Sequence, residues 1–189
     1  MTGRSQLRIL TGTLGGRRLE VAAGVRPTES RVREALFAIW QERIPDSAFL
    51  DLFAGSGAVG LEALSRGAAR ACFVESHPRA LAALRRNWEK TRGDLTPGSV
   101  EILRGSLPEA LGRLREERFD LIFADPPYSF SEYETLLHAA VGRVRPDGEI
   151  AVEHSARVEM TEQIAGWRRR ARHRYGETRL SFYRGTPQH

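Results

Sequence analysis

Residues 49–60 read Phe49-Leu50-Asp51-Leu52-Phe53-Ala54-Gly55-Ser56-Gly57-Ala58-Val59-Gly60, which is an apolar run followed by a glycine-rich turn. We predict that the run forms a buried strand and that a helix starts in the turn and continues to about residue 65. The glycines permit positive φ angles and a close approach of the backbone to a ligand. Their G-x-G-x-x-G spacing is also typical of dinucleotide-binding folds, so by itself it leaves NAD open.

The same strand-then-helix unit repeats on the C-terminal side of this stretch. Such an alternation predicts an α/β fold, in which a mostly parallel sheet is covered by helices on both faces. A hairpin at the end of the chain adds an antiparallel strand. We expect strands at residues 48–52, 71–75, 100–104, 119–124 and 149–153, helices at 79–90, 108–115, 132–143 and 159–165, and hairpin strands at 168–175 and 178–183 around Gly176.

The N-terminal side differs in character. Residues 1–25 read as a basic β arm with strand-like pieces at 7–11 and 16–21, and Arg26-Pro27-Thr28 interrupts it. A helix with Val32, Leu36, Ile39 and Trp40 on one face should follow. We therefore divide the chain into the arm, residues 1–25, and one catalytic-type domain, residues 26–189.

Composition narrows the class of protein. No apolar run approaches the roughly 20 residues that span a bilayer, and the N-terminus has no secretory signal, so we expect a cytoplasmic protein without membrane contact. Cys72 is the single cysteine, and no histidine has metal-ligand spacing, which predicts neither a disulfide nor a metal site. Nothing demands more than a monomer. The net charge is +5, and 29 basic residues less the single Lys90 leave 28 arginines, which favours a polyanionic partner.

Two carboxylates accompany the glycine turn. Asp51 lies inside the preceding strand, where it can reach the ammonium group of a cationic ligand. Glu75 ends the next strand, 24 positions later, where a carboxylate can accept hydrogen bonds from both hydroxyls of a ribose. Glu75 therefore indicates a nucleoside cofactor, whereas Asp51 favours a cationic one over a pyrophosphate.

The segment Asp125-Pro126-Pro127-Tyr128 carries the chemistry. It follows the strand at 119–124, and two prolines cannot continue a central strand, so they form a rigid loop. An exocyclic base amine is a poor nucleophile because its lone pair is delocalised into the ring. The Asp125 carboxylate and the Pro126 carbonyl can accept its N–H groups, while Tyr128 stacks on the base. This arrangement predicts methylation of a base amine, with no metal required.

Taken in order, these segments resemble the bacterial small-subunit ribosomal RNA guanine-N2 methyltransferase family of the class I methyltransferase superfamily. The matching segments are residues 26–28 with 31–37, residues 50–57 continuing through 60–68, the Asp125–Tyr128 loop, and Tyr175-Gly176 with Tyr183. The resemblance implies a Rossmann-like sheet of seven strands and transfer of a methyl group from S-adenosylmethionine to guanine 966 of 16S rRNA, in the small ribosomal subunit or an assembly intermediate.

The residue assignments follow from these patterns and from the resemblance. Asp125, Pro126 and Tyr128 are assigned to catalysis, and Pro127 and Tyr128 to substrate contact. The family usually has an acid near the adenine where this chain has Ser106. The expected cofactor-binding residues are Thr28, Asp51, Phe53, Gly55, Ser56, Gly57, Gly60, Glu75, Ser106 and Asp125.

Arginines gather at both ends of the chain and are candidates for phosphate contact. The N-terminal group directly precedes the cofactor turn and is the better placed: Arg8, Arg17, Arg18, Arg26 and Arg31, with Arg33 beside them. The closing hairpin carries Arg168, Arg169, Arg170, Arg172 and Arg174. For each of these side chains the alternative is an ordinary solvated face.

Three other functions stay open at this point. The Asp-Pro-Pro-Tyr loop also occurs in DNA adenine-N6 methyltransferases, although a chain of 189 residues leaves little room for their target-recognition region. A non-catalytic RNA-binding assembly factor could retain the same fold. An NAD-linked oxidoreductase is the least favoured, because no acid–base pair for hydride transfer is visible.

Overall fold

A computed structural model of the chain describes residues 7–22, 30–95, 99–114 and 118–185. Thr28 and Arg26, which were assigned to cofactor and RNA, lie outside these residues. In the part of the chain that is described, no helix is long and apolar enough to cross a membrane, and no group of His, Cys, Asp or Glu side chains could hold a metal ion.

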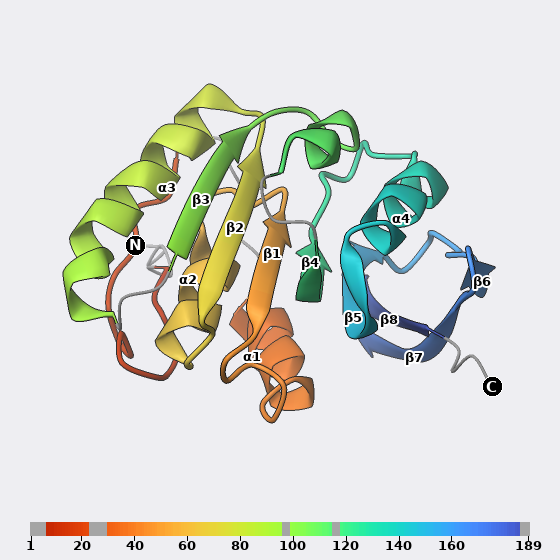
Figure 1. Ribbon diagram of the computed structural model, residues 1–189, viewed down its shortest axis with the longest axis horizontal. Coiled ribbons are helices and arrows are strands. Elements are labelled where there is room, and N and C mark those ends of the chain that lie inside the picture. Colours follow the sequence, from red (N-terminus) through yellow and green to blue (C-terminus); the bar gives the residue numbers. More distant parts are fainter. Residues whose placement is uncertain (1–6, 23–29, 96–98, 115–117, 186–189) are drawn as a thin grey trace.

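One twisted sheet runs through the molecule in the order β3-β2-β1-β4-β5-β8-β7-β6 (Figure 1). The first five strands in this order pair in parallel, and β8, β7 and β6 continue the sheet in antiparallel pairs. The fold class is therefore confirmed. The strands are β1 (Ala48–Leu52), β2 (Arg70–Glu75), β3 (Ser99–Arg104), β4 (Phe119–Ala124), β5 (Val144–Ser155), β6 (Gln163–Ile164), β7 (Trp167–Tyr175) and β8 (Thr178–Gly185).

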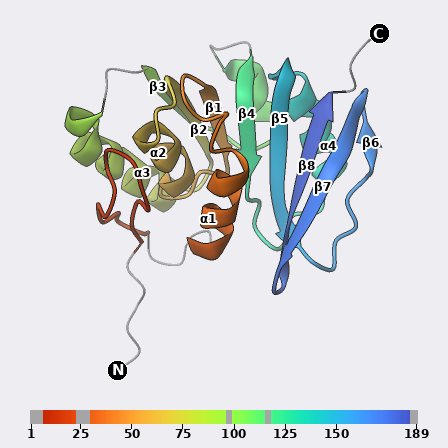
Figure 2. The ribbon, with the colours of Figure 1, turned by 90° about the horizontal axis from the view of Figure 1, so that it is seen from below.

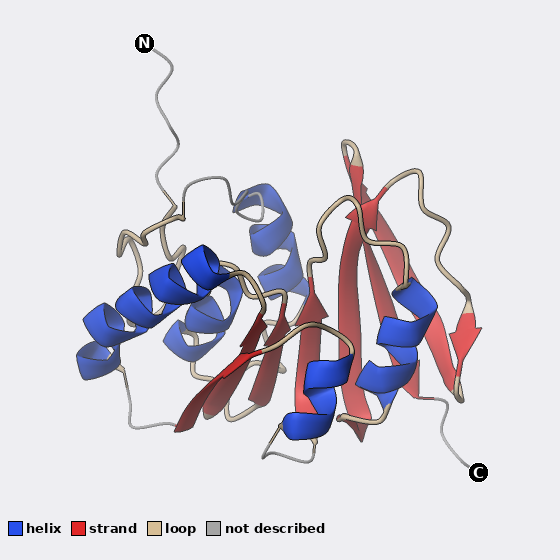
Figure 3. Cartoon of the chain, turned by 90° about the horizontal axis from the view of Figure 1, so that it is seen from above, coloured by secondary structure: helices blue, strands red, loops and turns tan. Residues whose placement is uncertain are grey.

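Helices cover both faces of the sheet, as Figures 2 and 3 show. Three α-helices contribute apolar side chains to the core on one face, and α4 with the short helix η2 contributes to the core on the other. The central strands are buried on both faces, which explains why they read as continuous apolar runs. The helices are α1 (Ser30–Ile39), α2 (Ala58–Ser65), α3 (Pro78–Thr91), η1 (Arg92–Asp94), η2 (Glu109–Arg113) and α4 (Tyr133–Val141).

The described part of the N-terminal arm packs on the face that α1, α2 and α3 cover. Its apolar side chains Leu7, Ile9, Leu14 and Leu19 are buried in that core. Glu62 of α2, itself fully buried, accepts hydrogen bonds from the backbone amides of residues 10 and 11 at 2.7 and 3.1 Å. Its two expected strand-like pieces pair through only one isolated antiparallel bridge, between residues 8 and 18.

Two helix predictions are wrong. Residues 159–165 form no helix, because Ala165 and Gly166 both adopt positive φ in a tight turn that pairs β6 with β7. Strand β6 is thus an eighth strand beyond the seven expected. Residues 108–115 contain a short 3₁₀ helix, η2, instead of an α-helix; Gly112 lies within it and disfavours a longer helix.

Two single residues show how the core is packed. Cys72 is a buried core residue of β2. Trp40, fully buried, packs edge-on against Phe49 and Phe182, and its indole N–H donates to Glu149 at 2.7 Å. Such a partner is what a buried indole requires.

Candidate active site

A cavity of about 480 Å³, the main cavity, lies at the edge of the sheet where the parallel strands end. The ends of β1, β2, β4 and β5 and the start of the antiparallel β8 meet at this edge. The cavity is lined by residues in or just after these strand ends, including Asp51, Phe53, Glu75 and Asp125, and by Thr178 at the start of β8. Ligands of open α/β sheets bind at this position because the loops there connect strands to helices on opposite faces.

Asp51 lies in the floor of the main cavity and is only 2% exposed. Its Oδ2 accepts a hydrogen bond from the backbone N–H of Gly60 at 2.9 Å, which joins β1 to the first turn of α2. Burial raises the pKa of the Asp51 carboxyl to about 8, and the nearby carboxylates of Asp125 and Glu75 act in the same direction. A cation placed beside Asp51 would favour its ionised form.

Glu75 uses its two carboxylate oxygens to shape the glycine turn. Oε2 accepts the backbone N–H of Gly55 at 2.7 Å, and Oε1 accepts that of His77 at 2.7 Å. Each carboxylate oxygen has a second lone pair. Glu75 lines the cavity, so it can hold the turn and still accept two hydrogen bonds from a ligand diol.

The glycines of the turn serve different purposes. Gly55, at φ 56°, lines the main cavity, whereas Gly57 and Gly60 do not. A Cβ on Gly57, at φ 83°, would come within 2.2 Å of Leu84, and one on Gly60 within 2.3 Å of Phe73. These two glycines therefore let α2 pack closely against β2 and α3, and this packing holds the glycine turn in position on the side away from the cavity.

The Asp125–Tyr128 loop closes one side of the cavity, and all four of its residues line it. The Phe130 amide donates to the Pro127 carbonyl at 2.8 Å, which tightens the loop into a turn. No described residue donates a hydrogen bond to the Pro126 carbonyl. Tyr128 is 65% exposed, an unusual position for a large aromatic side chain, and its ring is accessible to a base.

An aromatic chain supports this loop from within the fold. Phe53 at the end of β1, held at φ 60°, packs edge-on against Phe130, which packs edge-on against Tyr133 of α4. Tyr133 in turn contacts the ring of His154. A non-glycine residue at positive φ is uncommon and concentrates at functional sites, and Phe53 lines the main cavity.

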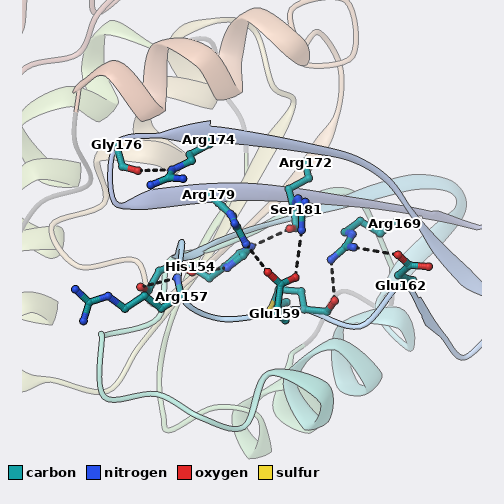
Figure 4. Close-up of polar contacts among 12 residues, drawn as sticks. His154, Arg157, Glu159, Glu162, Arg169, Arg172, Arg174, Gly176, Arg179 and Ser181 are labelled. Carbon is teal, nitrogen blue, oxygen red and sulfur yellow. Dashed lines mark hydrogen bonds and ion pairs between the residues drawn. The ribbon is translucent and has the colours of Figure 1, made fainter.

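The His154 ring is fixed from both sides (Figure 4). Nδ1 lies 3.0 Å from the carbonyl oxygen of Ser155, and Nε2 lies 2.8 Å from the hydroxyl of Ser181. Because a carbonyl only accepts, Nδ1 carries the proton and Nε2 accepts from the hydroxyl. Burial lowers the pKa of His154, and the nearby Arg179 and Arg169 act in the same direction, which keeps the ring neutral.

The main cavity has an acidic lining. Four carboxyl groups line it, Asp51, Glu75, Asp125 and Glu153, of which Asp51 holds its proton up to about pH 8, and no arginine or lysine of the described residues does so. Such a lining favours a cationic ligand and opposes the pyrophosphate of NAD. The contribution of β5 and β8, through Glu153, His154, Ser155 and Thr178, was missed by sequence reasoning. The available signal was the rule that strand ends share one edge of the sheet.

Several expected site residues lie elsewhere. Ser106 does not line the main cavity, and its carbonyl accepts the Ala110 amide at 2.9 Å. Arg8, Arg17 and Arg18 are exposed on the arm, with Arg17 paired to Asp94. Arg33 is fully buried and donates to the Arg8 carbonyl at 2.9 Å, so it braces the arm and cannot reach an RNA.

Most arginines of the closing hairpin are engaged with the protein's own acceptors. Arg170 pairs with Glu149, and Arg172 and Arg179 both pair with Glu159. Arg174 donates to the Gly176 carbonyl at 2.9 Å (Figure 4). Each of these four side chains therefore already has an acceptor within the protein.

A sheet with this strand order, five parallel strands and an antiparallel closing hairpin defines a class I methyltransferase fold. Residues 7–184 match the family model described as "Conserved hypothetical protein 95", and the chain belongs to this family. It is 33% identical to the Bacillus subtilis protein named "Putative rRNA methyltransferase YlbH" over 94% of this chain and 98% of that protein. It is 35% identical to ribosomal RNA small subunit methyltransferase D of Escherichia coli K12, covering 84% and 76% of the two chains.

Solved structures agree with these sequence relationships. The structure of yhhF from Escherichia coli matches with a TM-score of 0.82 at 31% identity, over 97% of this chain and 99% of that chain. A hypothetical protein of Thermus thermophilus matches with a TM-score of 0.77 at 34% identity, over 95% and 99%.

Proposed function

We propose that the protein transfers a methyl group from S-adenosylmethionine to the exocyclic N2 amine of a guanine in 16S rRNA. The observation that carries this proposal is the main cavity, which combines Asp51, Glu75 and the Asp125–Tyr128 loop at one edge of the sheet. Family membership and the names of the Bacillus and Escherichia relatives support an rRNA substrate. We infer that the RNA is met in the small ribosomal subunit or an assembly intermediate, by a monomer.

The residues of the main cavity fit the cofactor. Glu75 would accept hydrogen bonds from the ribose hydroxyls, and Asp51 would face the ammonium group of the amino-acid part. Phe53, Gly55 and Ser56 would form the walls, with Gly57 and Gly60 holding the turn in place. The four carboxylates would stabilise the positive charges of the sulfonium and ammonium groups, which NAD lacks at these positions.

The catalytic loop would orient the base. The Asp125 carboxylate and the Pro126 carbonyl accept one N–H of the amine each, which turns the nitrogen lone pair toward the methyl donor. Tyr128 stacks on the guanine ring, a contact worth about 1–3 kcal/mol. When bound, the cofactor would supply an electrophilic methyl group on a sulfonium, so that the nitrogen lone pair could form the N–C bond while the C–S electron pair stays on sulfur. Asp125 then directs the displaced amine proton toward solvent.

RNA contact is assigned to the exposed arm and its neighbours. Arg8, Arg17, Arg18 and Arg31 would bind phosphates, together with Arg26 and with Pro127 beside the target base. We accordingly treat residues 1–25 as an RNA-contacting arm and residues 26–189 as the methyltransferase domain. Phosphate contacts of this kind make affinity strongly dependent on salt.

The test is methyl transfer from labelled S-adenosylmethionine to small ribosomal subunits from cells that lack the activity, followed by digestion to nucleosides. We expect label in N2-methylguanosine. Label in N6-methyladenine of a DNA control would instead assign the protein to the adenine-N6 class, and cofactor binding without any label would favour an assembly factor.

The matched variant is Asp125→Ala. Removal of an acceptor that acts on the reacting amine should lower kcat by a factor of at least about 100 while S-adenosylmethionine still binds. Full activity of this variant would refute the catalytic assignment, and Asp147→Ala, an exposed acid at the opposite edge of the sheet, serves as the control.

A further inference from the structure

A second cavity of about 440 Å³ lies beside the Asp125–Tyr128 loop, outside the main cavity. We call it the hairpin cavity, because Tyr175, Gly176 and Glu177 at the tip of the β7–β8 hairpin form part of its wall. Tyr128, Ser155 and Thr178 line both cavities. A ligand in the hairpin cavity would therefore lie next to a base bound at Tyr128 in the main cavity.

The two cavities differ in charge. The main cavity has four carboxylates and no arginine or lysine among the described residues, whereas Arg31 and Arg157 both line the hairpin cavity. The Arg31 guanidinium reaches the hairpin tip, since a Cβ placed on Gly176 would be 4.0 Å from its Nη2. One carboxylate, Glu177, is also present, and it can accept a hydrogen bond from a base N–H.

Arg157 differs from the arginines around it. Arg172 and Arg179 are paired with Glu159, and Arg169 donates to the Met160 carbonyl at 2.7 Å. The Arg157 guanidinium makes no hydrogen bond or ion pair with any described residue, and Figure 4 shows it pointing away from the Glu159 cluster.

The backbone around Arg157 is held firmly. The Val158 amide donates to the Ser155 carbonyl at 3.0 Å, and the Ala156 amide to the Glu177 carbonyl at 2.8 Å. A fixed turn thus presents this cation at the cavity.

Aromatic surface accompanies the positive charge. Tyr175 is half-buried, anchored against the core that α1 covers, and lines the hairpin cavity, while the exposed Tyr128 stands between the two cavities. Aromatic rings beside arginines are the combination that binds single-stranded nucleic acid, because bases stack on the rings and phosphates pair with the guanidinium groups.

We propose that the hairpin cavity binds the nucleotide adjoining the target guanine in the same RNA strand, with its phosphate at Arg31 and Arg157 and its base on Tyr175. This inference rests on the proposed function for the identity of the target. Binding the neighbour in this cavity would hold the strand open beside Tyr128, so that the target base enters the main cavity alone.

The test measures affinity for small ribosomal subunits lacking the modification at a series of salt concentrations, with S-adenosylmethionine affinity as the folding control. Arg157→Ala should weaken binding and reduce the slope of log affinity against log salt by about 0.7, the value for one contact to a single-strand phosphate. Arg143→Ala, which removes one charge just before β5 at the opposite edge of the sheet, should leave the slope unchanged. Equal slopes for Arg157→Ala and the wild type would overturn the proposal.

The aromatic contact has its own readout. Tyr175→Leu should lower affinity by roughly 5- to 150-fold without altering the salt slope, because it removes stacking and no charge. Tyr175→Phe keeps the ring and should stay near the wild type; equal losses in both variants would contradict stacking.

These outcomes are separable from the proposed function. A wild type that methylates guanine N2 together with an Arg157→Ala variant of unchanged slope refutes only the hairpin cavity. A wild type that binds subunits but transfers no methyl group refutes the methyltransferase assignment, whatever the slopes.

Discussion

The Asp51 carboxylate accepts the backbone N–H of Gly60 at 2.9 Å and thereby joins the first central strand to the helix that follows the glycine turn. The carboxyl is almost fully buried, and this burial raises its pKa to about 8. The same side chain thus holds the glycine turn and carries a titratable group in the main cavity. Both the stability of the protein and its binding of a cationic ligand should therefore depend on pH.

The first expected consequence concerns stability. The folded chain holds the Asp51 proton more tightly than the unfolded chain, in which aspartate titrates near pH ~3.9. The tighter binding of the Asp51 proton therefore contributes fully to the free energy of unfolding below that pH. As the pH rises, this contribution falls by at most about 1.4 kcal/mol per pH unit, and it is lost once the pH passes about 8. Asp51→Asn removes this dependence. In urea unfolding without cofactor, the free energy of unfolding of the variant should therefore rise relative to that of the wild type as the pH increases. Parallel stability curves for the two proteins would contradict the raised pKa.

The second consequence concerns cofactor binding. A cationic ligand beside Asp51 favours its ionised form, so binding of S-adenosylmethionine below about pH 8 should release a proton. Titration calorimetry in two buffers of different ionisation enthalpy measures this release directly. The Asp51→Asn variant should show none; equal proton release in both proteins would place the effect on another group.

Gly60 should tolerate no side chain. A Cβ there would lie 2.3 Å from Cε1 of Phe73, a rigid buried ring, so Gly60→Ala should destabilise the fold by about 1–3 kcal/mol through overpacking. Gly112→Ala is the matched control, because a Cβ at Gly112 meets nothing within 4 Å. Chemical denaturation of both variants measures the difference, and equal stabilities would show that α2 can shift away from β2.

Asn87 should couple the arm to the glycine turn. Its Oδ1 accepts the Glu20 amide at 2.8 Å, and its Nδ2 donates to the carbonyls of Glu20 at 3.0 Å and Ser56 at 2.9 Å. Asn87→Ala removes the partner of the buried Ser56 carbonyl and of the partly buried backbone groups of Glu20, so it should cost about 1–3 kcal/mol of stability and weaken S-adenosylmethionine binding. Arg85→Ala, an exposed change on the same helix, controls for α3 itself. Lower stability with unchanged cofactor affinity would reduce Asn87 to a purely structural residue.

The elements that were predicted well are those whose signals are local. Apolar runs in β1, β2 and β4 are buried on both faces of a parallel sheet, so their sequences alone identify them as strands. The helix expected at 159–165 failed because its apolar residues pack in a two-strand hairpin, whose turn depends on positive φ at Ala165 and Gly166. Arg33 reads as a surface cation on α1, yet the arm covers it completely.

The alternation of apolar runs with helical segments along the chain was enough to predict the α/β fold class. The glycine turn, Asp51, Glu75 and the Asp125–Tyr128 loop could each be located from the residues immediately around them. The folded chain, in contrast, was needed to show that Glu153, His154 and Thr178 complete the main cavity, and that Arg157 and Tyr175 line a second cavity together with Tyr128. The reason is physical: β8 runs antiparallel and starts at the edge where β5 ends, so hydrogen-bonded pairing brings residues distant in sequence to one place. No local pattern encodes that juxtaposition, since it depends on the strand order of the whole sheet.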